Sequence, residues 1–323
     1  MNKHGKFIRQ GACLIITLAF NLGVASLAAA QVDSEDVEKL NEAVTFLYKA
    51  GKFEEAIPFA EKTLKLREQT LGQDHAKVAA SLNNLAELKR KLGQYEEADP
   101  LYQRSLAISE KILGPFHPRV AYPLNNLALL YETMGHYSEA EVLLKRALSI
   151  RINSLGKSHP DVAQSLNNLA TIYLKKGDYE KAEANLMQAL SIRESVLGRD
   201  NPKVAVTLAN LADLRKKMGK AKEAEALYQR ARSIRQKAAN ASAGDRALSL
   251  NNLATLYREH GEYSKAAPLY KQSLEISERT YGENHPEVAE ILINMAELYY
   301  DMGEFSEAQT LYRRAQQIKE NTH

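Results

Sequence analysis

Cysteine is nearly absent from this sequence: the only one is Cys13, close to the N-terminus. Disulfide bonds therefore cannot hold the chain together, and its stability must come from packing. An excess of one charge is also missing, because after residue 30 there are 40 basic and 40 acidic residues. A neutral body has no general attraction to phosphate backbones or to anionic lipid, so we expect neither nucleic acid nor a membrane surface as a partner.

Long apolar runs are missing except between Ala12 and Ala30. This run follows three basic residues and ends on small residues at Ala28 and Ala30, a pattern typical of a secretory signal peptide. We expect residues 1–30 to be a signal peptide cleaved after Ala30, and the remainder to be exported to the periplasm or secreted. The alternative is an uncleaved N-terminal anchor, although the run is barely long enough to span a bilayer.

Catalytic motifs are lacking as well. There is no Gly-rich phosphate loop, no nucleophile elbow and no HExxH sequence. His75, His117, His159 and His285 recur at multiples of 42 residues, but equivalent positions on stacked helices lie about 8–10 Å apart, whereas zinc needs ligands at about 2.0 Å. We therefore interpret these histidines as turns that open a helix, and we expect no metal, no cofactor and no enzymatic activity.

What the sequence does contain is a repeat of 42 residues. SLNNLAELKRKLGQYEEA at Ser81 is matched by PLNNLALLYETMGHYSEA at Pro123, SLNNLATIYLKKGDYEKA at Ser165 and SLNNLATLYREHGEYSKA at Ser249. Weaker copies begin at Thr207 and Ile291, and a divergent copy precedes them all. The predicted repeats run over 31–72, 73–114, 115–156, 157–198, 199–240, 241–282 and 283–323.

Each repeat is predicted to form two helices. In the third repeat, apolar residues recur at helical spacing after Pro118, and Gly135 supplies a left-handed stop. A second helix is expected to begin near Ser138, which forms a capping-box pattern with Glu141, and to stop at Gly156. No segment shows the alternation of a β-strand. One helix pair cannot bury both of its faces, so neighbouring pairs must stack to build the core.

The recurring pattern N-L-A-x-L-Y, then G-x-Y-x-E-A, then L-Y-x-R-A-L resembles the tetratricopeptide repeat. The 42-residue period and segments such as LGPFHPRVAYPLNNLALLY are similar to the kinesin-light-chain type. This resemblance covers residues 31–323. It implies an all-α, right-handed superhelical solenoid of stacked antiparallel helix pairs (TPR) that binds other proteins. The fifth and sixth repeats depart most from the pattern, at Ala209, Arg215, Ala221, Arg232 and the segment ASAGDRA, so packing there is expected to be looser.

The resemblance also implies where a ligand would bind. In similar proteins one face of the first helix lines a concave groove that holds an extended peptide, and the second asparagine of each pair contacts the peptide. The matching residues here are Asn84, Asn126, Asn168, Asn210, Asn252 and Asn294. The alternative is that these asparagines bond neighbouring helices and belong only to the repeat pattern. For the first asparagine of each pair, the two interpretations have equal weight.

Reading the same face along the chain adds six further candidates for the groove. These are Tyr122, Leu129, Leu174, Lys175, Lys216 and Lys217. The face is expected to be basic in its first and middle parts, apolar near the centre, and acidic at the end, where Glu290, Glu297 and Asp301 stand. Such a groove would suit a peptide with acidic residues around an apolar anchor.

Three functional hypotheses follow from the sequence. The leading one is a non-enzymatic scaffold that binds an extended peptide of another protein. A second is a structural protein that self-associates through its end repeats, which light scattering would distinguish from a monomer. A third is a non-catalytic adaptor subunit of an enzyme complex, which co-purification would reveal.

Overall fold

The computed structural model describes residues 36–238 and 242–320, and within these ranges every regular element is helical. The predicted signal peptide, residues 1–30, lies outside the described residues. The helices are one over 36–49, α2 (Phe53–Leu71), α3 (Ala76–Lys91), α4 (Tyr95–Leu113), η1 (Pro118–Val120), α5 (Ala121–Thr133), α6 (Tyr137–Leu155), α7 (Pro160–Lys176), α8 (Tyr179–Leu197), α9 (Pro202–Lys217), α10 (Ala221–Lys237), α11 (Ala243–Glu259), α12 (Tyr263–Tyr281), α13 (Pro286–Asp301) and α14 (Phe305–Glu320).

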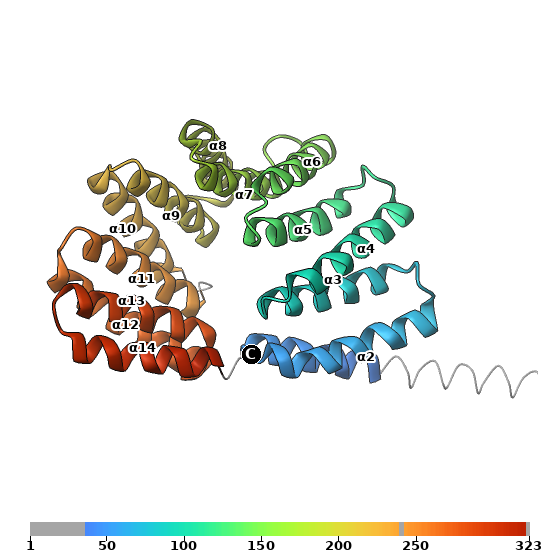
Figure 1. The fold of residues 1–323 in the computed structure, drawn as a ribbon. Coiled ribbons are helices and arrows are strands. Elements are labelled where there is room, and N and C mark those ends of the chain that lie inside the picture. Colours follow the sequence, from blue (N-terminus) through green and yellow to red (C-terminus); the bar gives the residue numbers. More distant parts are fainter. Residues whose placement is uncertain (1–35, 239–241, 321–323) are drawn as a thin grey trace, which may run out of the picture.

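The helices pack in consecutive pairs that stack side by side into an arc (Figure 1). Helices α3 and α4, α5 and α6, and so on to α13 and α14 form the pairs, and each pair contacts the next. The first helices also touch one another from pair to pair, as α3 does with α5 and α7 with α9. The predicted all-α solenoid of stacked helix pairs is therefore confirmed.

The histidines of the turn open the first helix of their repeats. The Nδ1 atoms of His75, His117, His159 and His285 each accept a hydrogen bond from the backbone N–H two residues further on, at 3.1–3.2 Å. Asn201 does the same in the fifth repeat, with its Oδ1 2.9 Å from the N–H of Lys203. These bonds satisfy a donor that the first turn of a helix leaves free. The interpretation of this position as a helix-opening turn is confirmed.

The second helices begin differently from the prediction. Helix α6 starts at Tyr137, so Ser138 lies inside the first turn, and the cap residue His136 forms no side-chain capping bond. The capping box predicted for Ser138 and Glu141 is therefore wrong, because Ser138 would have to occupy the cap position itself. The stop signals are right: Gly135 has a φ of 80° and Gly156 one of 84°, values that favour glycine.

Alanines allow the helices of a pair to approach closely. Ala140 and Ala147 are fully buried in α6, and Ala128 is almost fully buried in α5. Leu144 joins Ala128 and Ala140 in an apolar cluster that continues into α7 and α9. In α14, Gln316 is exposed where the earlier repeats place a partly buried leucine, as expected for a surface that no further described repeat covers.

A buried arginine links one repeat to the next. Arg67, Arg151 and Arg193 each extend from a second helix, and each Nη1 donates to a backbone carbonyl and to a hydroxyl of the following first helix. Arg193 also donates to Gln164 Oε1 at 2.7 Å. Because burial disfavours the charged form, the pKa of Arg193 is lowered to about 10. These side chains supplement apolar stacking with fixed polar links between repeats.

The junction between α10 and α11 lacks this link. Arg235 is buried at the equivalent position, but its Nε and Nη1 atoms have no hydrogen-bond partner within residues 36–238 and 242–320. The apolar core is nevertheless continuous here, since one cluster joins Ala224 and Tyr228 to Leu253 and Tyr270. At this junction the polar link is therefore incomplete, while the apolar packing continues across it.

Candidate peptide-binding groove

The inner side of the arc is formed by the first helices, because these contact one another across successive repeats. Their apolar stripe faces the second helices, and Leu82, Leu124, Leu208 and Leu292 are fully buried there. The predicted groove residues lie on the opposite side, where they are half-buried or exposed. Helical periodicity thus separates a structural face from a face that is accessible to a ligand.

The asparagines form a ladder between repeats. Asn126 Nδ2 donates to Asn83 Oδ1 at 2.6 Å, and Asn168 Nδ2 donates to Asn125 Oδ1 at 3.3 Å. The same contact recurs between Asn294 and Asn251, at 3.1 Å. The second asparagine of a pair therefore binds the first asparagine of the preceding repeat. The sequence left this structural role open as an alternative, and in these three repeats it is present.

The ladder does not use every hydrogen-bonding group of each side-chain amide. A side-chain amide offers two N–H donors and an acceptor oxygen, and Asn126, Asn168 and Asn294 remain partly accessible. Asn84 is exposed, and Asn210 and Asn252 are partly accessible. Asn252 faces a repeat in which Ala209 replaces the first asparagine. The series therefore has both a structural contact and remaining capacity to bond a ligand.

The central repeats bring five of the predicted residues to one hollow. Leu174 and Lys175 of α7 and Asn210, Lys216 and Lys217 of α9 line a cavity of about 640 Å³. Glu132, Thr171 and Asp213 also line it. The repeat register places these three on the same face of the first helices as the predicted site residues.

A second hollow lies between the second and third repeats. Asn84, Asn126 and Tyr122 line it together with Asn83 and Ile112, and its volume is about 400 Å³. Tyr122 is 57% exposed, and its ring centroid lies 5.5 Å from the Arg151 guanidinium. Leu129 of α5 is 41% exposed. The accessible apolar surface expected near the centre of the groove is therefore present at Tyr122 and Leu129.

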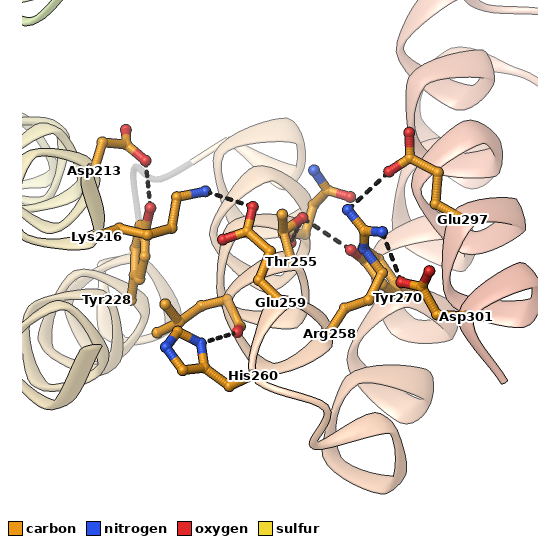
Figure 2. Close-up of polar contacts among 12 residues, drawn as sticks. Asp213, Lys216, Tyr228, Thr255, Arg258, Glu259, His260, Tyr270, Glu297 and Asp301 are labelled. Carbon is orange, nitrogen blue, oxygen red and sulfur yellow. Dashed lines mark hydrogen bonds and ion pairs between the residues drawn. The ribbon is translucent and has the colours of Figure 1, made fainter. Parts of the chain in front are cut away.

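Ion pairs between repeats change the predicted charge map. Lys216 Nζ lies 3.1 Å from Glu259 Oε1, and Arg258 binds both Glu297, at 2.8 Å, and Asp301, at 2.9 Å (Figure 2). The charge of Lys216 in the predicted basic centre is therefore balanced by Glu259, whereas the single charge of Arg258 balances only one of the two carboxylates at the predicted acidic end. The pattern within one repeat does not reveal these pairs, because the partners stand one repeat apart.

The second repeat has its own internal pair. Arg90 lies 2.6 Å from Glu87, and Glu87 also accepts hydrogen bonds from Tyr48 and Tyr102. Burial alone would raise the pKa of Glu87, but the Arg90 hydrogen bonds and charge hold it below its usual range. Arg90 is thus occupied by a neighbour and adds little positive charge to the groove.

The central hollow presents the ammonium groups of Lys175 and Lys217. Both are exposed, and neither forms an ion pair with any residue that the structure describes. Two carboxyl groups line the same hollow, and burial raises the pKa of both Glu132 and Asp213. Asp213 also accepts a hydrogen bond from Tyr228 (Figure 2). The hollow therefore combines two solvent-facing ammonium groups with two partly desolvated carboxyl groups.

The chemistry available in the groove is that of binding. Amide donors and acceptors, two lysines, and the accessible Leu129 and Tyr122 can contact a polypeptide backbone, acidic side chains and apolar side chains. Across the described ranges, no group of three or more His, Cys, Asp or Glu side chains is arranged to hold a metal ion. None of the described helices is long and apolar enough to cross a membrane.

Comparisons with known proteins agree with this architecture. A family model of the tetratricopeptide repeat matches residues 37–111, 77–153, 161–237 and 243–321, and another matches residues 125–194. No curated protein matches the chain.

Solved structures of similar fold include kinesin light chain-like repeat proteins. BtubC (BKLC) from P. vanneervenii is 24% identical with a TM-score of 0.57, over 71% of this chain and 92% of that one. Nearly identical TPR-like repeats of a Podosopora anserina protein named as a kinesin light chain are 27% identical with a TM-score of 0.53, over 63% and 97%. The Rap conjugation gene regulator of plasmid pLS20, in complex with a Phr peptide, is 20% identical with a TM-score of 0.62, over 87% and 72%.

Proposed function

This chain belongs to the tetratricopeptide-repeat family, and from that premise we propose that it is a non-enzymatic scaffold that holds an extended peptide segment of a partner protein. The proposed site is the inner face of α5, α7 and α9. The observation that carries the proposal is the central hollow, where Lys175 and Lys217 are exposed beside Leu174 and Asn210. The fold supports the same proposal, since the Rap regulator of similar fold is seen with a bound peptide.

The proposed ligand carries an acidic residue close to an apolar one. Lys175 and Lys217 offer charge-assisted hydrogen bonds to a carboxylate, and Leu129 offers accessible apolar surface. The partly accessible amides of Asn126, Asn168 and Asn210 would bond the peptide backbone. The acidic preference is assigned to the central repeats, where Lys175 and Lys217 line one hollow, whereas Arg90 of the second repeat pairs with Glu87.

Selection from a random-peptide display library tests this proposal. We expect the wild-type chain to enrich peptides in which an acidic residue lies near an apolar one. The double variant Lys175→Glu and Lys217→Glu should lose this enrichment, because each reversal turns attraction into repulsion. The lysines are a better target than the asparagines, since replacing Asn126 or Asn168 would also remove a contact between repeats.

A matched control variant shows whether a change of net charge alone affects peptide enrichment. Lys62 of α2 and Lys222 of α10 are exposed on second helices, so reversing both changes the net charge by the same amount away from the groove. The control variant should enrich the same peptides as the wild type. Identical enrichment by the groove variant, or no enrichment by the wild type, would reject the proposal.

Self-association is a second candidate, favoured by the apolar side chains exposed on the last repeat. Tyr300 and Phe305 are 60% and 62% exposed, and their rings pack in a T-shaped contact with centroids 5.2 Å apart. Phe305 stands at a repeat position that is occupied by Tyr179 and Tyr263, which pack against the core of their own and neighbouring repeats.

Export to the periplasm or beyond is also proposed, on the signal-peptide pattern of residues 1–30 alone.

A further inference from the structure

The first and last repeats touch, so that the arc closes on itself (Figure 1). The turn between the helix over 36–49 and α2 lies against the start of α13. A Cβ atom placed on Gly51 would meet His285 Cδ2 at 2.7 Å and Pro286 Cδ at 2.8 Å. Two crevices flank this contact and are lined from both sides. The contact of Gly51 with His285 and Pro286 is called the end contact below.

The end contact buries a histidine that its equivalents leave accessible. His285 is only 7% exposed, whereas His75, His117 and His159 are half-buried while making the same capping bond. The His285 ring also stacks on Tyr281, with centroids 4.5 Å apart. An aromatic ring and the first repeat both cover His285, which leaves little room for water to solvate a charged imidazolium.

Protonation of His285 opposes this arrangement in two ways. Its Nδ1 atom accepts the N–H of Glu287 at 3.1 Å, and a proton on that atom would remove the acceptor. Burial, followed by the nearby Lys91 charge, lowers the pKa of His285. In an open arc the first repeat would no longer cover the ring, and its pKa would rise toward the ordinary value of about 6.5.

Other charged and titratable groups surround the end contact. They are Tyr48, Lys49, Lys52, Glu54 and Glu55 of the first repeat, Lys91 of α3, Tyr281 and Glu283 at the end of α12 and in the loop after it, Glu287 and Glu290 of α13, and Lys319 of α14. Burial and the neighbouring Glu287 raise the pKa of Glu290. Protonation of Glu290 would thus favour closure, whereas protonation of His285 would favour opening. As the pH falls, His285 is protonated before Glu290, because the ordinary pKa of histidine is higher than that of glutamate.

We propose that the end contact is a latch that closes the solenoid into a ring, and that protonation of His285 opens it. The closed form is favoured above the ordinary histidine pKa and loses stability as the pH falls below it, because only the open form then binds the proton readily. One proton linked to opening lowers the closure equilibrium constant by up to about tenfold per pH unit. This proposal does not depend on the proposed peptide, because its readout is the distance between the two ends.

The latch can be tested by distance measurement between spin labels on a full chain in which Cys13 is replaced by serine. Labels on Lys62→Cys and Gln317→Cys, both exposed, report on the first and last repeats. At about pH 7.5 the short distance should dominate, and at about pH 5.5 a longer one should appear. His285→Asn should stay closed at both pH values, because Asn201 shows that asparagine caps a helix at this repeat position without titrating. His159→Asn should behave like the wild type.

A pair of glycine variants tests the contact itself. Gly51 and Gly93 have φ values of 72° and 74° in equivalent turns, so alanine strains both backbones alike. Only Gly51→Ala meets the last repeat, since nothing lies within 4 Å of a Cβ on Gly93. Gly51→Ala should show the long distance at both pH values, and Gly93→Ala should retain the wild-type distances. Equal behaviour of the two variants, a wild-type distance that does not change with pH, or a pH response that persists in His285→Asn would overturn the proposal.

Discussion

Replacing Arg193 with methionine is expected to destabilise the chain by about 2 kcal/mol or more. The guanidinium is 2% exposed and donates to Lys203 O at 2.8 Å, Thr207 Oγ1 at 2.7 Å and Gln164 Oε1 at 2.7 Å. A hydrogen bond to a charged group is worth about 1.5–3 kcal/mol, so three of them exceed the cost of burying the charge. Methionine fills similar space but makes none of these hydrogen bonds.

The matched control is Arg235→Met at the junction of α10 and α11. Arg235 is equally buried, but two of its nitrogens have no partner in the described part of the chain. Replacing buried ionic groups by well-packed apolar residues is often neutral or stabilising by about 1–4 kcal/mol, and the Nε and Nη1 atoms of Arg235 make no hydrogen bond that would offset the cost of its burial. Urea unfolding should therefore give a lower midpoint for Arg193→Met and an equal or higher midpoint for Arg235→Met. The reverse order would show that the buried arginines do not link the repeats as described.

Enlarging Ala182 to leucine is the second substitution with a large expected effect. Ala182 is fully buried in α8, and the equivalent positions are Ala56, Ala98, Ala140, Ala224, Ala266 and Ala308. Extra methyl groups would force α7 and α8 apart, at a cost of about 1–3 kcal/mol. Because each repeat stacks on its neighbours, we expect the loss to extend to the adjacent repeats.

Ala184→Leu on the same helix provides the comparison. Ala184 is exposed, so the same substitution there should change stability by no more than about 0.5 kcal/mol. Thermal unfolding followed by circular dichroism would measure both variants. Similar melting temperatures for the two variants would mean that close helix approach at Ala182 is not required.

The fold could be predicted because its signals are local and repeated. The helix-opening histidines and the stops at Gly135 and Gly156 each depend on a few neighbouring residues. The capping box at Ser138 failed because a shift of one residue in the helix start removes the geometry that the motif requires. The sequence pattern therefore predicted the existence of each helix better than the residue at which it begins.

The groove was predicted less completely, because its electrostatics depend on contacts between repeats. Lys216 pairs with Glu259, and Arg258 pairs with Asp301, each across one repeat. The ladder between Asn126 and Asn83 is of the same kind. Reading one repeat at a time shows which side chains share a face, but not which of them bind one another. The contact of Gly51 with His285 joins the two ends of the arc, and no local pattern encodes it.

The central claim is that a partner peptide lies against the inner face of α5, α7 and α9. Photo-crosslinking followed by mass spectrometry tests it most directly, using a library-selected peptide that carries a photoreactive group. The account predicts crosslinks close to Leu129, Leu174 and Lys217. Crosslinks close to Val142 and Met187, which are exposed apolar residues on α6 and α8, would place the ligand on the second helices and contradict the account.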